Sequence, residues 1–251
     1  MAAAPKRSSY WQATRAPRHS LLFALPLLAA YELLAFALSR AELSEVRNGA
    51  DVLLKSVFVA LGGRYGLSLF SAVLLGVGLV LVWRDRRARG PVQPRLFAGM
   101  LLESVLYASL LGGVASALTT LLLHGRLPMA LPAAAQGFAD LSLSTQLMVS
   151  LGAGIYEELL FRVLLVGGLV VLARGVLRLG GLAAGVFATV LGALLFSLFH
   201  YLGPLGDELT LGSFTFRAIA GVLFSVLYLL RGLGITAWTH ALYDVFLALM
   251  S

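Results

Sequence analysis

The chain has 251 residues, of which 59% are hydrophobic and 12% are charged, and it contains no cysteine. An ordinary soluble domain is roughly 25% charged, so the composition excludes a soluble globular protein, and without thiols there are no disulfides or cysteine chemistry. The net charge of +7 would suit a nucleic-acid partner. However, the basic residues lie mostly between apolar runs, as the positive-inside rule describes. We therefore expect an all-α, polytopic transmembrane helical bundle whose partner is the lipid bilayer, with no nucleic acid.

Apolar runs close to the ~20 residues that cross a bilayer core predict about seven spans, with six to eight possible. In chain order they cover about residues 20–39, 65–83, 96–123, 145–173, 181–201, 216–230 and 233–250. The first run is long, contains Glu32 and lacks a clean small-residue cleavage site, which favours a retained span over a signal peptide. Residues 40–64 mix charged and apolar side chains, as in a loop or an interfacial helix.

The basic segments predict the orientation of the chain. The N-terminus, the loop at 84–95, the loop at 174–180 and Arg231 all fall on one side of a seven-span bundle. That side should be cytoplasmic, with the C-terminus outside. The preference for Arg over Lys, with much Ala, Gly and Leu, indicates a GC-rich bacterium and hence its inner membrane. We expect residues 1–144 to form an N-terminal tail with three spans, and residues 145–251 to form a four-span catalytic core.

Several ionisable residues lie within the predicted spans, where each costs at least ~2.5–3.5 kcal/mol and therefore needs a partner or a function. They are Glu32, Glu103, Glu157, Glu158, Arg162, His200, His240 and Asp244. The roles of Glu32 and Glu103 stay open, because either could join a polar interior or lie near an interface.

The segment "EELLFR" at 157–162 concentrates three of these charges. Glu158 and Arg162 are spaced i, i+4, which predicts an ion pair on one helix face. Glu157 projects about 100° around the helix from Glu158, so one arginine does not easily serve both carboxylates. A carboxyl left unpaired in an apolar setting is the stronger base, which makes Glu157 the candidate catalytic base.

Two histidines on later spans complete a candidate site. His240 and Asp244 share a helix face at i, i+4, where a carboxylate can orient an imidazole ring. A carboxylate base with His200 and His240 can activate a water and stabilise an oxyanion. On paper Glu157, His200 and His240 also form a His₂Glu zinc set, which the spacing neither requires nor excludes. The chain has no HExxH and no GxSxG motif.

The three motifs "EELLFR" (157–162), "FSLFH" (196–200) and "HALYD" (240–244) together resemble the CAAX-protease and bacteriocin-processing (CPBP, or Abi) family of intramembrane endopeptidases. The resemblance covers about residues 145–250. It implies that Glu157 activates the attacking water with help from His200, and that His240 and Asp244 line the oxyanion side. Glu158 and Arg162 would support the site, and Phe196 would pack beside it. We favour the glutamate-type mechanism without a cofactor, with zinc as the alternative.

One position departs from the CAAX-cleaving members, which carry Asn where this chain has Asp244. Ionised Asp donates no hydrogen bond, so Asp244 is either protonated or serves by orienting His240. The resemblance implies a protein or peptide substrate cut near the membrane, such as an exported or C-terminally anchored protein. The alternative is a non-catalytic membrane protein, such as a bacteriocin immunity factor or a scaffold.

Overall fold

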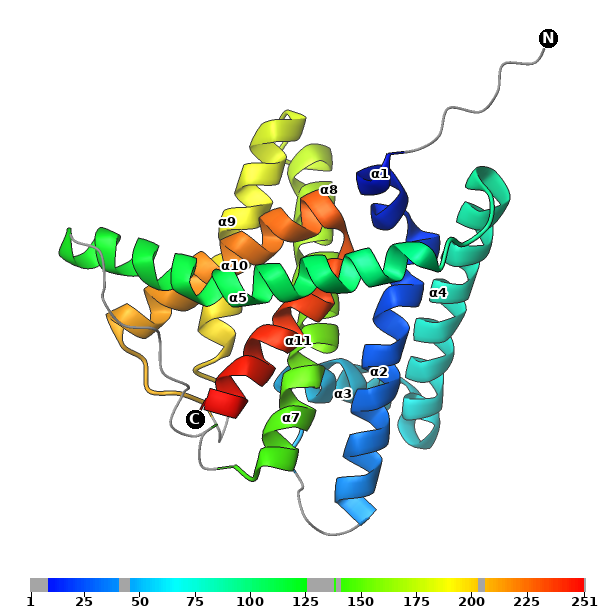
Figure 1. The fold of residues 1–251 in the computed structure, drawn as a ribbon, viewed down its shortest axis with the longest axis horizontal. Coiled ribbons are helices and arrows are strands. Elements are labelled where there is room, and N and C mark those ends of the chain that lie inside the picture. The colour runs from blue at the N-terminus through cyan, green and yellow to red at the C-terminus, as the bar shows by residue number, and fades with distance from the viewer. Residues whose placement is uncertain (1–8, 41–45, 126–137, 139–140, 203–205, 251) are drawn as a thin grey trace.

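The computed structural model describes the whole chain except residues 1–8, 41–45, 126–137, 139–140, 203–205 and 251. All regular structure in the described part is helical, so the predicted all-α class is confirmed. The elements are α1 (Tyr10–Arg15), α2 (Pro17–Arg40), α3 (Gly49–Gly62), η1 (Gly63–Tyr65), α4 (Gly66–Arg89), α5 (Arg95–His124), α7 (Leu143–Gly152), η2 (Ala153–Val166), α8 (Gly167–Gly175), α9 (Gly181–Phe199), α10 (Leu211–Arg231) and α11 (Leu233–Met250) (Figure 1).

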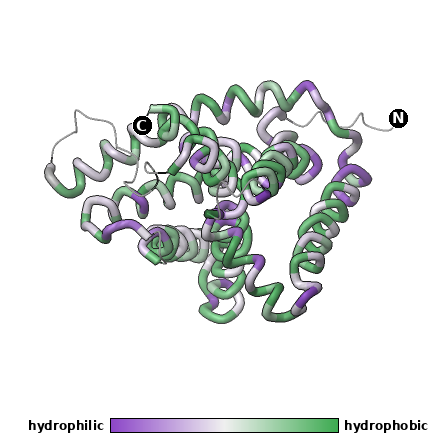
Figure 2. Tube along the Cα trace, turned by 90° about the horizontal axis from the view of Figure 1, so that it is seen from below, coloured by the Kyte–Doolittle hydropathy of each residue, from purple (hydrophilic) through white to green (hydrophobic). Residues whose placement is uncertain are grey.

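Six helical stretches in the described part are long and apolar enough to cross a membrane. They are Pro17–Arg40, Gly49–Arg89, Arg95–Leu123, Gly181–Phe199, Leu211–Arg231 and Leu233–Met250. The chain is therefore a multi-pass membrane protein, and six spans lie within the predicted range of six to eight. Hydrophobic residues dominate the helical trace (Figure 2). Many remain exposed, as on the outer face of α4, where lipid chains can cover them.

The predicted span at about 145–173 is the one missing from those six. In the structure, α7, η2 and α8 follow one another without a break from Leu143 to Gly175. The difference is local, because η2 is wound as a π-helix between two short α-helices. Gly167 at its end, for example, donates its N–H to the carbonyl of Arg162, five residues earlier. π-helical turns are rare and occur frequently at functional sites.

The segment 40–64, predicted as a loop or an interfacial helix, contains α3. A sharp turn at η1 connects α3 to α4, and Gly63 there has a φ of +52°, which glycine adopts readily. Gly66 lies against the backbone of the preceding helix, and a Cβ at this position would fall 2.4 Å from the Cα of Val59. The α3–α4 turn therefore depends on glycine, and α3 itself contacts η2.

The long elements alternate in direction, and α5 lies across them (Figure 1). The N-terminal helix α1 and the ends of α4, α8 and α10 lie toward the upper end of that view. These helix ends carry basic residues: Arg86, Arg87 and Arg89 lie in the last turn of α4, and Arg231 is the last residue of α10. The start of α7 and the C-terminal end of α11 lie at the opposite end.

Helix α11 lies at the centre of the bundle and contacts α2, α5, α7 and η2. Its approach to η2 is close, because a Cβ on Gly154 would lie 2.5 Å from the carbonyl oxygen of Ala237 and 2.6 Å from the Cβ of Ala241. Small residues allow such close packing between membrane helices. This contact brings His240 of α11 next to the glutamates of η2.

Candidate active site

The glutamate pair and Arg162 lie inside the bundle on η2. All three side chains are buried, and Glu158 is fully enclosed. The Nε atom of Arg162 lies 3.2 Å from Oε2 of Glu158, so the predicted ion pair is present. The guanidinium group also lies over the rings of Phe196 and Phe224, at 4.4 and 5.3 Å from their centroids. Arg162 is thus held between one carboxylate and two aromatic faces.

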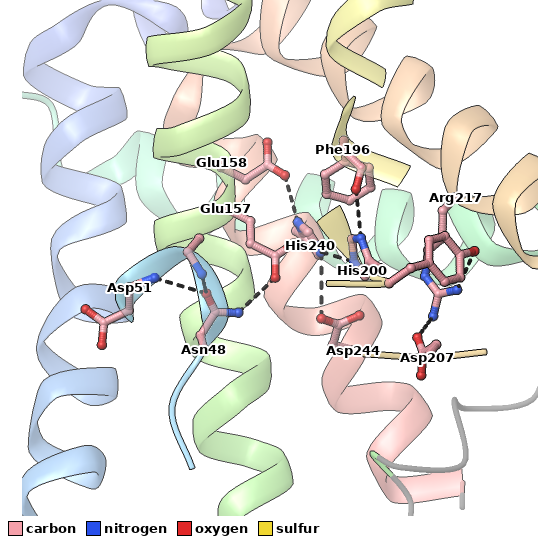
Figure 3. A network of polar contacts seen from close by, with 12 residues as sticks. Asn48, Asp51, Glu157, Glu158, Phe196, His200, Asp207, Arg217, His240 and Asp244 are labelled. Atoms are coloured by element: carbon pink, nitrogen blue, oxygen red, sulfur yellow. Dashed lines mark hydrogen bonds and ion pairs between the residues drawn. The ribbon is translucent and has the colours of Figure 1, made fainter. Parts of the chain in front are cut away.

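His240 connects η2 to α11. Its Nδ1 lies 2.7 Å from Oε1 of Glu158, and its Nε2 lies 3.7 Å from Oδ2 of Asp244 (Figure 3). The ring stacks on Phe224 with a centroid separation of 4.4 Å. Sequence spacing suggested Asp244 as the residue that orients this ring. The short contact, however, is made by Glu158, from a helix that lies 82 residues earlier in the chain.

His200 directly follows the last residue of α9. Its Nδ1 lies 2.8 Å from the backbone oxygen of Phe196. A carbonyl oxygen only accepts hydrogen bonds, so Nδ1 carries the proton and the Nε2 of the neutral ring is an acceptor. That Nε2 lies 3.9 Å from Oε2 of Glu157. The distance is too long for a direct hydrogen bond and suits a bridging water.

Glu157 has a partner that the sequence analysis did not identify. The side-chain amide of Asn48, at the start of α3, donates to Oε1 of Glu157 at 2.8 Å. Within the described residues, no group donates a hydrogen bond to Oε2, the oxygen that faces His200. Asn–Gly ahead of an apolar run indicates a helix N-cap, but nothing local links position 48 to position 157.

The edge of the site is partly open. The side chains of His200 and Asp244 are 24% and 23% exposed, whereas Glu157 behind them is 9% exposed. Arg217 of α10 lies beside His200 and forms an ion pair with Asp207 (Figure 3). Its guanidinium also donates to the hydroxyl of Tyr201 at 3.1 Å. Access is therefore past His200 and Asp244, near a charged pair from α10 and the segment before it.

Phe196 packs within the site, as the family resemblance implies. Its ring lies 4.8 Å from that of His200 and 6.2 Å from that of His240. Phe161 of η2 contacts it edge-on at 5.1 Å. The aromatic side chains fill the space between the two imidazoles and limit the room for bulk water.

A metal ion needs a group of ligands that face one point. Among the described residues, no group of three or more His, Cys, Asp or Glu side chains is arranged in this way. The Nδ1 atoms of both histidines are engaged by Phe196 and Glu158. The three side chains of the His₂Glu set considered from the sequence therefore do not face one point.

The other two membrane carboxylates lie in separate polar clusters. Glu32 forms an ion pair with Lys55 at 2.9 Å and accepts a hydrogen bond from Tyr156. Glu103 forms an ion pair with Arg231, with an Nε–Oε1 distance of 2.5 Å. The side chain of Glu103 is 13% exposed and belongs to the polar interior, whereas that of Glu32 is 42% exposed and lies at the edge of its cluster. The sequence alone had left both roles open.

Fold and site together define a class of protein: a multi-pass membrane protein with a buried carboxylate–imidazole cluster, which is the equipment for activating water. Residues 139–246 match the family model described as type II CAAX prenyl endopeptidase Rce1-like. These residues form a domain of that family, which is a family of proteases, and the predicted CPBP resemblance is confirmed over this region. No curated protein and no solved structure matches the chain significantly.

Proposed function

We propose that the protein is an intramembrane endopeptidase in which Glu157 activates water to hydrolyse a peptide bond. One observation carries this proposal: the buried Oε2 of Glu157 has no hydrogen-bond donor among the described residues and faces the acceptor nitrogen of His200 at 3.9 Å. Membership of a protease family supports the same chemistry. A carboxylate oxygen and an imidazole lone pair, side by side, accept the two protons of one water.

In the first step, Glu157 removes a proton from that water while the water oxygen attacks the carbonyl carbon of the substrate. His200 holds the second O–H through Nε2, because its Nδ1–H is already donated to Phe196. The attack forms a C–O bond and moves the carbonyl electron pair onto oxygen. General base catalysis of this kind contributes about 10²–10⁴ in rate.

The developing oxyanion needs a donor, and His240 supplies it. The ring faces a carboxylate at each nitrogen, Glu158 at 2.7 Å and Asp244 at 3.7 Å. Two carboxylates favour the imidazolium form, which donates from both nitrogens. Nε2–H is then directed to the oxyanion, and Asp244 supports the charge without donating. Collapse of the intermediate breaks the C–N bond as Glu157 returns its proton to the leaving amine.

The substrate we propose is an exported or C-terminally anchored protein of a bacterial inner membrane. The basic ends of α4 and α10 lie on one side of the bundle, which the positive-inside rule makes cytoplasmic (Figure 1). His200 follows the opposite end of α9, away from the basic turn that precedes this helix. The site then opens toward the outer face, where exported proteins emerge.

The test compares the membrane and secreted protein termini of a strain that carries the wild-type chain with those of a Glu157→Gln strain. Glu103→Gln serves as the matched control, because it also removes the charge of one largely enclosed carboxylate but lies in another cluster. Termini that disappear only in Glu157→Gln support the proposal and name the substrates. An unchanged set of termini in a well-folded Glu157→Gln strain rejects it in favour of a non-catalytic role.

A further inference from the structure

Among the described residues, Asn48 is the one that donates a hydrogen bond to the side chain of Glu157, and it lies outside the family match at 139–246. Its side chain is almost fully buried, with 3% of its surface exposed. We propose that Asn48 is a positioning residue, which fixes the carboxylate of Glu157 for water activation. The inference rests on the proposed function, and it assigns part of the active site to the N-terminal region of the chain.

The hydrogen-bond network fixes which way the amide of Asn48 points. Its Oδ1 caps α3 by accepting from the backbone N–H groups of Ala50 at 2.9 Å and Asp51 at 3.4 Å. A carbonyl oxygen held by two donors leaves the NH₂ group as the end that faces Glu157. The amide therefore serves two tasks at once, because each end has its own partner.

The contact with Glu157 determines which carboxylate oxygen is free. Asn48 occupies Oε1, so Oε2 remains directed at His200. The carboxylate also lies beside the N-terminal end of α3, where the positive end of the helix dipole favours a negative charge. Both effects hold Glu157 ionised and in one orientation, as a general base requires.

The position of α3 is itself held by a network of charged side chains that is centred on the buried Asp51. Asp51, one turn into the helix, accepts from the hydroxyl of Tyr31 at 2.7 Å and pairs with Lys55 at 2.7 Å. Lys55 reaches on to Glu32 of α2, which also binds Tyr156, the neighbour of Glu157 in the chain. This network ties α2, α3 and η2 together and keeps Asn48 at the site.

Gly152 supplies the space for this approach. A Cβ at position 152 would lie 2.7 Å from the Cβ of Asn48 and 2.6 Å from the ring of Tyr31. Contacts this short cannot be accommodated without moving α3. A side chain at Gly152, at the end of α7, would therefore disturb the contact between Asn48 and Glu157. Gly152→Ala provides a second variant that leaves Asn48 itself unchanged.

The experiment measures kcat and KM of the purified full-length chain in lipid vesicles. The substrate is a peptide that spans a terminus lost in the Glu157→Gln strain, and rates are expressed per folded molecule. Asn48→Ser keeps a good helix cap but cannot reach Glu157. We expect its kcat to fall about 10- to 150-fold, the range for a hydrogen bond to a charged group, with little change in KM.

Asn48→Asp separates positioning from structure. Asp caps helices as well as Asn does, so a purely structural role predicts near wild-type rates, whereas a positioning role predicts a loss at least as large as in Asn48→Ser. Gly152→Ala should also lower kcat. Wild-type kcat per folded molecule in both Asn48 variants overturns the inference, whereas an active Glu157→Gln overturns the proposed function itself.

Discussion

Two largely enclosed glutamates of this protein differ in how fully their carboxylates are hydrogen-bonded. Glu103 on α5 has two donors on each carboxylate oxygen, all within 3.0 Å, from Arg231, Tyr10 and Tyr107. Glu157 on η2 has a single donor, Asn48, on one oxygen and none on the other within the described residues. Both lie in apolar helices and are equally conspicuous in the sequence.

The difference separates a carboxylate that holds helices together from one that is available for chemistry. Arg231, which pairs with Glu103, also reaches Thr14 at 3.0 Å and the backbone of Trp11 at 3.3 Å. This cluster fastens α1, α5 and α10 to one another. A buried pair of this kind resists change because removing either partner leaves a charge without compensation. Glu157 keeps one oxygen without a hydrogen-bond donor, which costs stability and leaves that oxygen free for the proposed role as a base.

The largest effect should come from Glu157→Gln. Glutamine keeps the shape and the contact with Asn48 but cannot take a proton from water, so we expect a loss of about 10²–10⁴ in kcat. The unfolding midpoint in detergent should be unchanged or higher, because an unsatisfied carboxylate has been removed. A large drop in the midpoint would place Glu157 with Glu103 as a structural carboxylate.

Glu103→Ala should show the reverse pattern. Loss of one partner from this buried pair is expected to destabilise the protein by about 3–5 kcal/mol, measured by denaturant unfolding in mixed micelles. Hydrolysis per folded molecule should stay at the wild-type level. The double variant Glu103→Leu/Arg231→Met should recover much of the stability that Glu103→Ala loses, since an apolar pair leaves no charge without a partner. A loss of kcat per folded molecule without a loss of stability would contradict a purely structural role for Glu103.

Glu158→Gln tests the carboxylate between these extremes, which has both a structural partner in Arg162 and a site partner in His240. Removing its charge weakens the imidazolium form of His240. We expect kcat to fall about 10- to 150-fold, the range for a hydrogen bond to a charged group. Denaturant unfolding of Glu158→Gln and of Arg162→Met in mixed micelles separates the structural role of Glu158 from its role at the site. Equal rates in wild type and Glu158→Gln would remove His240 from the oxyanion step.

Asp244→Asn should have the smallest effect. Asp244 lies 3.7 Å from Nε2 of His240 and makes no direct hydrogen bond to it. The amide weakens the imidazolium slightly but adds a donor for the oxyanion, so the two effects offset each other. We expect kcat to change less than about tenfold, or ~1.4 kcal/mol. A complete loss would show that the carboxylate itself takes part in proton transfer.

Sequence reasoning succeeded where partners lie one turn apart on one helix, or where a motif marks them. The i, i+4 pair of Glu158 and Arg162 is present at 3.2 Å, and the all-helical membrane fold follows from composition and apolar run length. The three motifs do converge, with Glu157 near His200 and Glu158 near His240. Their catalytic roles remain a prediction, and so does the division of the chain at residue 144.

The rest depended on contacts between distant segments. Lys55 and Arg231, the partners of Glu32 and Glu103, lie 23 and 128 positions further along the chain, and Asn48 lies 109 positions before Glu157. No periodicity carries such pairings, because they arise only when helices pack. The π-helical winding of η2 left no composition signal either, since its residues suit an ordinary α-helix equally well.

Gly154 has a consequence for how sequences related to this one can vary. Because its missing side chain sets the distance between η2 and α11, the position tolerates no larger residue without parting Glu158 from His240. A relative that has lost the proposed activity can therefore keep all of the proposed catalytic side chains. A substitution at this glycine would identify such a relative. The residue at this position would therefore indicate loss of activity as well as the residues at the two glutamate positions do.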